Sequence, residues 1–370
     1  NWDIINLDTL RHYHIGIRSS KIIPSLILYF CCNCVIMHFM KINENVKIKE
    51  LTTMRLGGLA RYVIELETVE DVEKAYLFAK EHQLPVFILG TGSNVIGKDE
   101  GFKGVILLNR IKGIRFIDEL TIDAMGGELL DDLVAFTTEK NLSGIEALSA
   151  IPGTVGAAPV QNVGAYGQEI EQVLESVHAY DLKEEKYVTI KKEDMNLGYR
   201  QSIFNQGKDA GRYLIISMRI HLSHDRLTPP FYTSLQSYVE EHQITDFSPK
   251  SIREMVTEIR WSKLPKPEEM ASSGSFFKNV YLDDQEAERL RSMNVPVWKG
   301  NKVPSGWLID HAGLKGKSFY GMRVSEKAAL ILINESAQSY AHLKQAREEI
   351  VSIIEKKYGL TLKQEPVELE

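Results

Sequence analysis

The feature that most restricts the fold of this chain is the stretch SAIPGTVGAAPVQNVGAYG at residues 149–167. Four glycines and two prolines in nineteen residues argue against a regular helix or strand over most of its length. Long loops of this kind inside a compact domain are uncommon and are usually functional. We therefore expect a functional loop here, held by the regular elements on either side.

The chain before this loop alternates strand and helix signals. Thr68 is a suitable N-cap, and the residues after it place apolar side chains at the i, i+3, i+4 and i+7 positions of one helical face. A strand is expected before this helix, and the strand after it leads into a glycine-rich turn, LGTGSNVI. The expected elements are strands at 62–66 and 85–89, strands between 104 and 124, a helix at 129–140, and strands around 176–180, 187–190 and 213–222.

The pattern changes after residue 222. Residues 223–230 are a polar stretch that ends in two prolines, which favours a domain boundary. Further on, Ser248 is a suitable N-cap with Pro249 at the first helical position, and Gly359 is a good residue to close a helix. The expected elements are a helix at 249–261 and an amphipathic helix with apolar positions 343, 346, 350 and 353, and the residues at 264–273 are proline-rich and polar.

Charge and cysteine content exclude several classes of function. The formal net charge is -6, so nothing global favours binding to nucleic acid or to an acidic membrane. The three cysteines lie together at 31, 32 and 34, without the paired spacing of a zinc site. The rest of the chain therefore has no disulfide framework, thiolate metal site or cysteine nucleophile, which fits a reducing cytoplasm. No metal is expected.

The first 39 residues differ from the rest. Basic residues precede an apolar run at 26–39, which is short compared with the roughly 20 residues of a membrane span. Such a pattern is open to interpretation as a signal peptide or an anchor. We favour an atypical extension upstream of Met40, and we expect no insertion into a membrane.

The turn at residues 89–96 suits a phosphate, because bare backbone N–H groups can approach an anion closely. Gly90, Gly92, Ser93 and Asn94 fit this use. The turn lacks the spacing of a P-loop, and it lacks the G-x-G-x-x-G that opens a helix in dinucleotide-binding folds. Taken alone, it is better interpreted as an ordinary tight turn.

Three segments taken together change this interpretation. TMRLGG at 53–58, LGTGSNVI at 89–96 and IPGTVGAAPVQNVGAYG at 151–167 resemble, in this order, the FAD-binding domain of the vanillyl-alcohol-oxidase-like flavoproteins. Within that group the chain is similar to the UDP-N-acetylenolpyruvoylglucosamine reductases, whose loops wrap the pyrophosphate and ribityl chain of FAD. Thr91 stands where the family usually has glycine, a mild departure. The resemblance implies FAD-binding roles for Arg55, Gly57, Gly58, Gly90, Thr91, Gly92, Ser93, Asn94, Pro152, Gly153, Thr154, Gly156, Ala157, Gly164, Ala165, Tyr166 and Gly167.

The resemblance also implies a fold. It covers the chain from about residue 50 onward and predicts an α+β protein, with an FAD-binding domain of two α/β subdomains and a C-terminal α/β substrate-binding domain. We place the FAD-binding domain at 40–222 and the substrate-binding domain at 223–370, after the extension at 1–39. Because these three segments hold no Cys or His that could form a covalent tether, we expect non-covalent FAD.

Two further segments, GYRQSIF at 198–204 and GSFFKN at 274–279, resemble catalytic segments of the family. In the family, reduced flavin delivers hydride to the β-carbon of an enol ether conjugated to a carboxylate, and negative charge builds on the α-carbon and the carboxylate. Such a site needs a cation at the carboxylate and an acid for the α-carbon. The resemblance makes Arg200 the cation, since its planar fork suits a carboxylate, and Ser275 the proton donor.

Each of these residues has a plainer interpretation without the motifs. Arg200 alone would be an ordinary salt-bridged arginine, and Ser275 would be a turn or N-cap serine. A serine hydroxyl is a poor acid, so it suffices only for a strongly basic intermediate. The third catalytic member implied by the family is a glutamate three residues after a leucine, which matches Glu365. Glu368 is the competing position, and an exposed acid near the chain end is the plain alternative.

The resemblance assigns substrate contacts as well. Lys263 precedes Ser275 by twelve residues, the spacing of a substrate- or NADPH-binding lysine in the family. Tyr232, after two prolines, matches a tyrosine that closes over the UDP-sugar in one subtype, although a core tyrosine is nearly as good an interpretation. The remaining substrate-binding candidates are Tyr199 and Asn279.

The main hypothesis is a cytoplasmic, monomeric enzyme that reduces UDP-N-acetylglucosamine enolpyruvate to UDP-N-acetylmuramate with NADPH, for peptidoglycan synthesis. One alternative is an oxidase of the same flavin fold, which would not need the GSFFKN serine. Another is a catalytically silent protein that binds a UDP-sugar. The joint presence of Arg200, Ser275 and Glu365 argues against a silent protein.

Overall fold

The computed structural model describes residues 28–31, 34–37 and 40–369. The extension predicted at 1–39 lies largely outside these residues. Its described part is a small antiparallel hairpin of β1 (Leu28–Cys31) and β2 (Cys34–Met37). None of the described helices is both long and apolar enough to cross a membrane.

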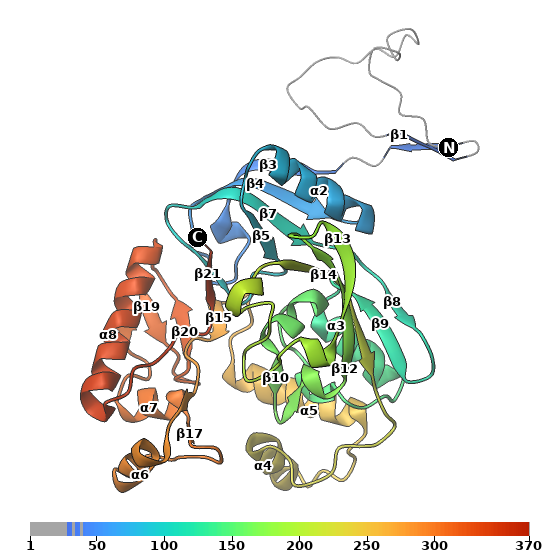
Figure 1. The fold of residues 1–370 in the computed structure, drawn as a ribbon. Coiled ribbons are helices and arrows are strands. Elements are labelled where there is room, and N and C mark those ends of the chain that lie inside the picture. The colour runs from blue at the N-terminus through green and yellow to red at the C-terminus, as the bar shows by residue number, and fades with distance from the viewer. Residues whose placement is uncertain (1–27, 32–33, 38–39, 370) are drawn as a thin grey trace.

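The first layer of the protein is a four-stranded sheet in the order β3-β4-β7-β5, covered by one helix (Figure 1). Thr68 caps that helix in a capping box with Asp71, as the sequence predicts for its start. The apolar positions Val72, Ala75 and Ala79 pack into the core between helix and sheet. The elements are β3 (Ile42–Lys47), β4 (Leu59–Leu66), α2 (Val69–Glu81), β5 (Val86–Leu89), β6 (Val95–Gly97) and β7 (Phe102–Asn109).

A second, antiparallel sheet follows, in the order β13-β12-β14-β9-β8. The predicted loop at 149–167 contains only short 3-10 turns and the start of a small hairpin, so the prediction of a long irregular segment is confirmed. The elements are β8 (Ile114–Phe116), β9 (Thr121–Met125), α3 (Leu130–Glu139), β10 (Gly164–Ala165), β11 (Gln168–Glu169), β12 (Leu174–Asp181), β13 (Lys186–Lys191) and β14 (Tyr213–His221).

Two helices follow the predicted boundary at 223–230. The hydroxyl of Ser248 accepts a hydrogen bond from the Ser251 N–H and caps the second helix, with Pro249 in its first turn, which confirms the predicted start. Both helices share a core with Ala147 of the preceding part of the chain. The division into domains stays a prediction. The helices are α4 (Thr233–Glu241) and α5 (Pro249–Lys263).

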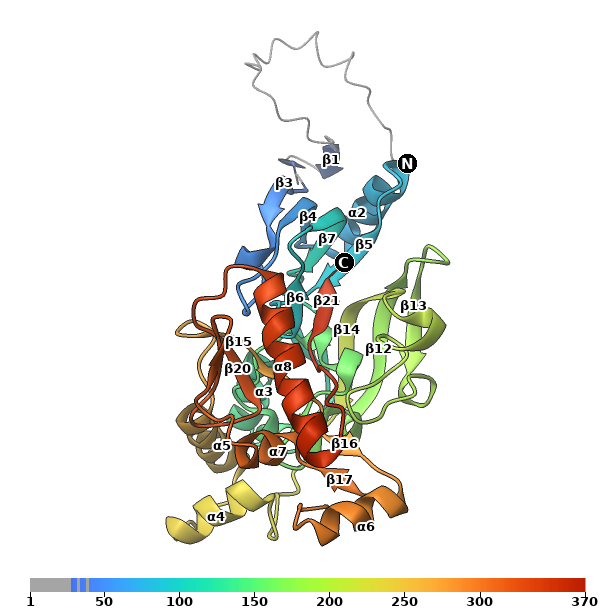
Figure 2. The same cartoon turned by 90° about the vertical axis from the view of Figure 1, so that its left-hand side faces the viewer.

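The C-terminal part is an antiparallel sheet, β15-β20-β19-β18, packed against a long helix that Gly359 closes with a φ of 72° (Figure 2). The proline-rich polar stretch at 264–273 runs into the first strand of this sheet, since pairing with Asn334 begins at Ala271. The smaller elements were not predicted from the sequence. The elements are β15 (Ala271–Ser275), β16 (Val280–Tyr281), α6 (Asp284–Ser292), β17 (Lys302–Val303), α7 (Ser305–His311), β18 (Ser318–Phe319), β19 (Met322–Val324), β20 (Ile331–Asn334), α8 (Tyr340–Tyr358) and β21 (Val367–Leu369).

The chain closes on itself through its last strand. β21 pairs in parallel with β6, and Val367 lies opposite Val95. The N–H of Val367 also donates to the carbonyl oxygen of Asn94, in the glycine-rich turn, at 2.9 Å. Residues 363–369 therefore connect the C-terminal sheet to the first layer.

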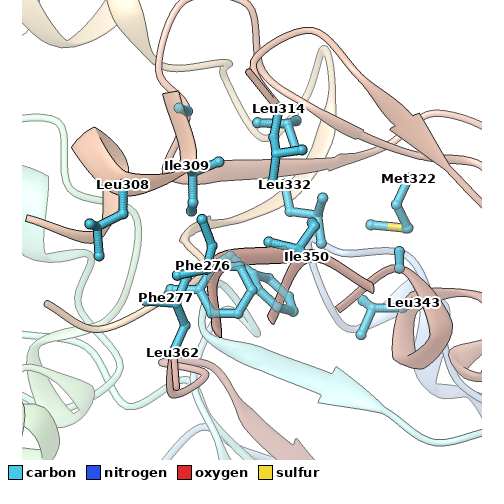
Figure 3. Packing of buried hydrophobic residues seen from close by; sticks show 14 of the residues in the cluster. Phe276, Phe277, Leu308, Ile309, Leu314, Met322, Leu332, Leu343, Ile350 and Leu362 are labelled. Atoms are coloured by element: carbon cyan, nitrogen blue, oxygen red, sulfur yellow. The ribbon is translucent and has the colours of Figure 1, made fainter. Parts of the chain in front are cut away.

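The C-terminal core is built around Phe276, which is fully buried against Phe277 with ring centroids 5.0 Å apart (Figure 3). We expect Phe276→Ala to lower the free energy of unfolding by about 3–5 kcal/mol, because the removed ring leaves a cavity. Chemical denaturation would measure this. Phe116→Ala is a suitable control, since that ring is 41% exposed, and an equal loss in both variants would contradict the prediction.

Candidate active site

The three glycine-rich segments lie against one another. The N–H of Thr53 donates to the carbonyl oxygen of Gly92 at 3.2 Å, and the hydroxyl of Ser93 donates to the carbonyl oxygen of Pro152 at 2.9 Å. Gly92 has a φ of 68°, and a Cβ there would lie 2.0 Å from the Leu51 carbonyl oxygen. The turn can therefore approach the first segment only because residue 92 has no side chain.

Gly92→Ala is expected to reduce the amount of FAD that copurifies with the protein, because the new methyl group must push the turn away from Leu51. Gly207→Ala is the matched control, since its φ of 71° carries the same backbone strain but no atom lies within 4 Å of the new Cβ. Flavin absorbance per protein would measure the effect. Equal FAD content in the two variants would show that the close approach does not matter.

Polar atoms at this junction remain available for a ligand. The hydroxyl oxygens of Thr53 and Thr91 are buried and have no hydrogen-bond partner within the described part of the chain. Buried polar groups are nearly always paired, so these atoms call for a partner that is polar. Thr91, where the family usually has glycine, thus adds to the turn a hydroxyl that can bind a polar ligand.

The side chain of Arg55 contacts the protein backbone rather than remaining free for a cofactor. Its Nη2 donates to the carbonyl oxygens of Pro267 and Glu268, at 2.8 and 2.9 Å. It therefore ties the first glycine-rich segment to the linker between α5 and β15. Its role in binding FAD stays a prediction.

The other predicted cofactor residues frame the same region. Asn94 donates from Nδ2 to Oε1 of Gln161, which joins the turn to the long loop at 2.8 Å. Gly58 lies where a Cβ would be 2.3 Å from the Asp99 carbonyl oxygen, and Gly90 where a Cβ would be 2.6 Å from the Thr154 hydroxyl. The remaining members lie in the same three segments: Gly57, Gly153, Gly156, Ala157, Gly164, Ala165, Tyr166 and Gly167.

Arg200 and Glu365 form an ion pair between the two halves of the protein. Nε of Arg200 lies 2.9 Å from Oε1 of Glu365, and the two side chains are 17% and 8% exposed. Nη2 of Arg200 donates to the carbonyl oxygen of Gly164 at 3.0 Å. Burial raises the pKa of the Glu365 carboxyl above its ordinary value, and the Arg200 guanidinium opposes this rise.

Glu368, the competing glutamate, lies elsewhere. Its carboxylate is paired with Arg347 at 2.6 Å and with Lys98 at 3.5 Å. The structure thus brings Glu365, and not Glu368, to Arg200. The catalytic role of Glu365 stays a prediction.

The segment that follows Ser275 pairs through its backbone with the segment that carries Glu365. Ser275 is the last residue of β15, and the next carbonyl oxygen, that of Phe276, accepts a hydrogen bond from the Glu365 N–H at 2.9 Å. Two residues further along, the N–H of Lys278 donates to the carbonyl oxygen of Lys363. The GSFFKN segment and the segment that carries Glu365 therefore lie side by side.

Tyr199 and Asn279 also meet. Nδ2 of Asn279 donates to the hydroxyl of Tyr199 at 3.2 Å, and Oδ1 of Asn279 accepts from the Ser305 N–H at 3.1 Å. Burial raises the pKa of the Tyr199 hydroxyl. Two of the predicted substrate-binding residues thus contact each other.

A lysine next to Tyr199 was not predicted from the sequence. Nζ of Lys302 lies 4.5 Å from the ring centroid of Tyr199, in a cation–π geometry. Burial lowers the pKa of the Lys302 ammonium, and the charge of Arg200 lowers it further. The lysine lies in a two-residue strand far along the chain from Tyr199, and no local pattern marks it.

Tyr232 and Lys263 are both exposed in the structure. Tyr232 is 47% exposed, and its ring centroid is 6.0 Å from that of Tyr166. Lys263 is the exposed last residue of α5. The same helix carries Arg260, also missed, whose buried Nε has no partner among the described residues and whose pKa is lowered by burial.

Comparisons with known proteins identify the family of this chain. The model of the FAD binding domain family matches residues 60–190, and that of the C-terminal domain of UDP-N-acetylenolpyruvoylglucosamine reductase matches residues 266–369. The UDP-N-acetylenolpyruvoylglucosamine reductase of Pseudomonas aeruginosa is 32% identical over 337 residues, covering 88% of this chain and 98% of that protein. That of Ralstonia nicotianae is 34% identical over 330 residues, covering 85% and 95%.

A crystal structure of UDP-N-acetylenolpyruvylglucosamine reductase from Thermus caldophilus superposes with a TM-score of 0.62 at 23% identity. The superposed region covers 90% of this chain and 100% of the Thermus caldophilus chain. Together with the FAD-binding match, it confirms the predicted α+β flavoprotein fold. The chain belongs to the UDP-N-acetylenolpyruvoylglucosamine reductase family.

Proposed function

We propose that this chain reduces the enolpyruvyl group of UDP-N-acetylglucosamine enolpyruvate to give UDP-N-acetylmuramate, a precursor of peptidoglycan, with NADPH as the reductant. The observation that carries the proposal is the Arg200–Glu365 pair, held beside the Ser275 backbone and next to the glycine-rich segments. Cation, carboxyl and hydroxyl are the groups that this reduction needs.

Arg200 would bind the carboxylate of the enolpyruvyl group. Its Nε and one Nη2 hydrogen are engaged by Glu365 and Gly164, while Nη1 has no acceptor within the described residues. A guanidinium can therefore be held on one side and still donate on the other. As negative charge builds on the substrate, this fixed cation stabilises it without having to move.

Ser275 would donate the proton to the α-carbon. A hydroxyl is a weak acid, so the step depends on the high basicity of the enolate-like intermediate. Glu365, whose pKa is raised by burial, keeps its proton at higher pH than an exposed glutamate does. We propose that this carboxyl, which Arg200 holds in place, takes part in the proton transfer to the substrate.

The residues present fit FAD. The buried hydroxyls of Thr53 and Thr91 lack partners among the described residues. At Gly92 the backbone of another segment occupies the space that a side chain would need. We propose that these loops hold the pyrophosphate non-covalently, with the other predicted residues of the three segments around the rest of the molecule. Bound FAD would supply the transfer of hydride from NADPH to the substrate.

We further propose a cytoplasmic monomer divided into an FAD-binding domain at 40–222 and a substrate-binding domain at 223–370. The substrate and NADPH are its partners, and the net charge of -6 gives no support for nucleic acid. Tyr199, Tyr232, Lys263 and Asn279 would contact the substrate. Size-exclusion chromatography with light scattering would check the oligomeric state.

A flavin absorbance spectrum tests the proposed function. The purified protein should show bound flavin that NADPH bleaches and that the enolpyruvyl UDP-sugar restores under anaerobic conditions. Bleaching by a plain alcohol and recovery in air would instead point to an oxidase. A preparation that stays colourless after addition of FAD would contradict both enzyme assignments.

A further inference from the structure

The turn that carries Arg200 has an unusual backbone. Gly198 and Gln201 exchange two backbone hydrogen bonds of 3.1 Å, so Tyr199 and Arg200 form a tight two-residue turn. Arg200 has a φ of 57°, in the left-handed region that favours glycine and asparagine. A strained residue of this kind persists only when its surroundings hold it in place.

A buried amide holds the first end of this turn. Nδ2 of Asn162 donates to the Gly198 carbonyl oxygen at 3.2 Å, and also to Glu169 and Glu171 at 3.0 and 3.1 Å. Oδ1 accepts from the Glu171 N–H at 3.1 Å. Asn162 is fully buried and is itself left-handed, with a φ of 44°.

A second amide holds the other end. Nδ2 of Asn205 donates to the carbonyl oxygen of Arg200 itself at 3.3 Å. Oδ1 of Asn205 accepts from the Ser202 N–H at 2.9 Å. The strained residue is therefore fixed from both sides by side-chain amides.

These contacts belong to a hydrogen-bond network that includes the hairpin of β10 and β11. Arg200 donates to Gly164 on one strand of that hairpin, and Asn162 donates to Glu169 on the other. Asn162 then returns to the turn through Gly198. Asn162 therefore ties the turn that carries Arg200 to the hairpin whose Gly164 carbonyl oxygen accepts from the guanidinium, in addition to the contact of Arg200 with Glu365.

We propose that Asn162 and Asn205 are positioning residues, which hold the turn at Arg200 so that its guanidinium meets the substrate carboxylate. This rests on the proposed function of Arg200. Neither amide contacts the reacting atoms. Each acts through the backbone of the turn, so its loss should affect the step that needs Arg200 and spare the reduction of flavin by NADPH.

The first test is Asn162→Gly, since glycine keeps the left-handed backbone and removes only the amide. Asn196→Gly is the matched control, because Asn196 also has a positive φ, of 48°, but is exposed. Stopped-flow measurement of both half-reactions should show reoxidation by the enolpyruvyl UDP-sugar slowed roughly tenfold to a hundredfold by the loss of orientation. Reduction by NADPH should stay within about twofold of the control, because that half-reaction does not need a cation at the substrate carboxylate.

If Asn162→Gly fails to fold, a second variant still tests the proposal. Asn205→Asp keeps the oxygen that accepts from Ser202 and removes the donor to Arg200. The same selective slowing of reoxidation is expected. Loss of both half-reactions in equal measure would overturn the proposal, because it would indicate a general structural defect.

A double-mutant cycle separates the proposal from the proposed function. With Arg200→Ala already present, Asn162→Gly or Asn205→Asp should change reoxidation by less than about twofold, because residues that act through one another are not additive. A full additional loss in that background would overturn the proposal. If Arg200→Ala alone leaves reoxidation unchanged, it is the role of Arg200 in the proposed function that fails.

Discussion

Ser275→Ala should leave the reduction of bound flavin by NADPH nearly unchanged and slow reoxidation by the enolpyruvyl UDP-sugar by about 10²- to 10⁴-fold, the usual contribution of a general acid. The hydroxyl is needed only when the α-carbon takes up its proton. The first half-reaction involves no such step. Stopped-flow absorbance of the flavin would follow the two half-reactions separately.

The surroundings of Ser275 make this a selective test. Its side chain is only partly buried, and the backbone that pairs Phe276 with Glu365 does not depend on it. Alanine is therefore expected to keep the strand in place. Ser318→Ala is a control in the same sheet, since Ser318 is exposed. Equal loss in both half-reactions for Ser275→Ala would mean that Ser275 is structural.

Arg200→Ala should slow reoxidation by about 10²- to 10³-fold, the usual effect of removing a group that stabilises developing charge. It also leaves Glu365 without its cation, at a position where the carboxylate is 8% exposed. Removing one partner of such a buried pair costs roughly 3 kcal/mol of stability. The variant should therefore be both slow in reoxidation and easier to unfold.

Arg212→Ala separates these two effects. Arg212 is 19% exposed and pairs with Asp181, which is 3% exposed, so it matches the burial of the Arg200 pair at a site away from it. It should lower stability in denaturant titrations without slowing reoxidation selectively. If the two variants slowed reoxidation alike, the loss would follow from instability rather than from the missing cation.

The sequence predicted the larger elements well because their signals are local. Thr68, Ser248 and Gly359 lie at the helix ends they predict, and the glycine-rich stretch is irregular. Caps and helical periodicity depend on neighbours within a few residues. The short C-terminal strands have no such signal, since strands of two residues are defined by their partners rather than by their own pattern.

The site was predicted through motifs rather than through geometry. The structure places Arg200, Glu365 and the Ser275 strand together, as the order of motifs suggested. Lys302 and Arg260 were missed because each is an ordinary basic residue in sequence. Only the tertiary fold buries them near Tyr199 and Tyr166. Long-range contacts of this kind leave no trace in local spacing.

The pairing of β21 with β6 has a consequence for biosynthesis. Most of the described chain separates the two strands, and closing so large a loop is slow compared with forming helices and hairpins. Since domains form in order as the ribosome delivers them, the cofactor loops can take shape well before Glu365 emerges. Because the Val367 N–H also bonds the Asn94 carbonyl oxygen, we expect the glycine-rich turn and the Arg200–Glu365 pair to be completed only after the last residues of the chain have been made.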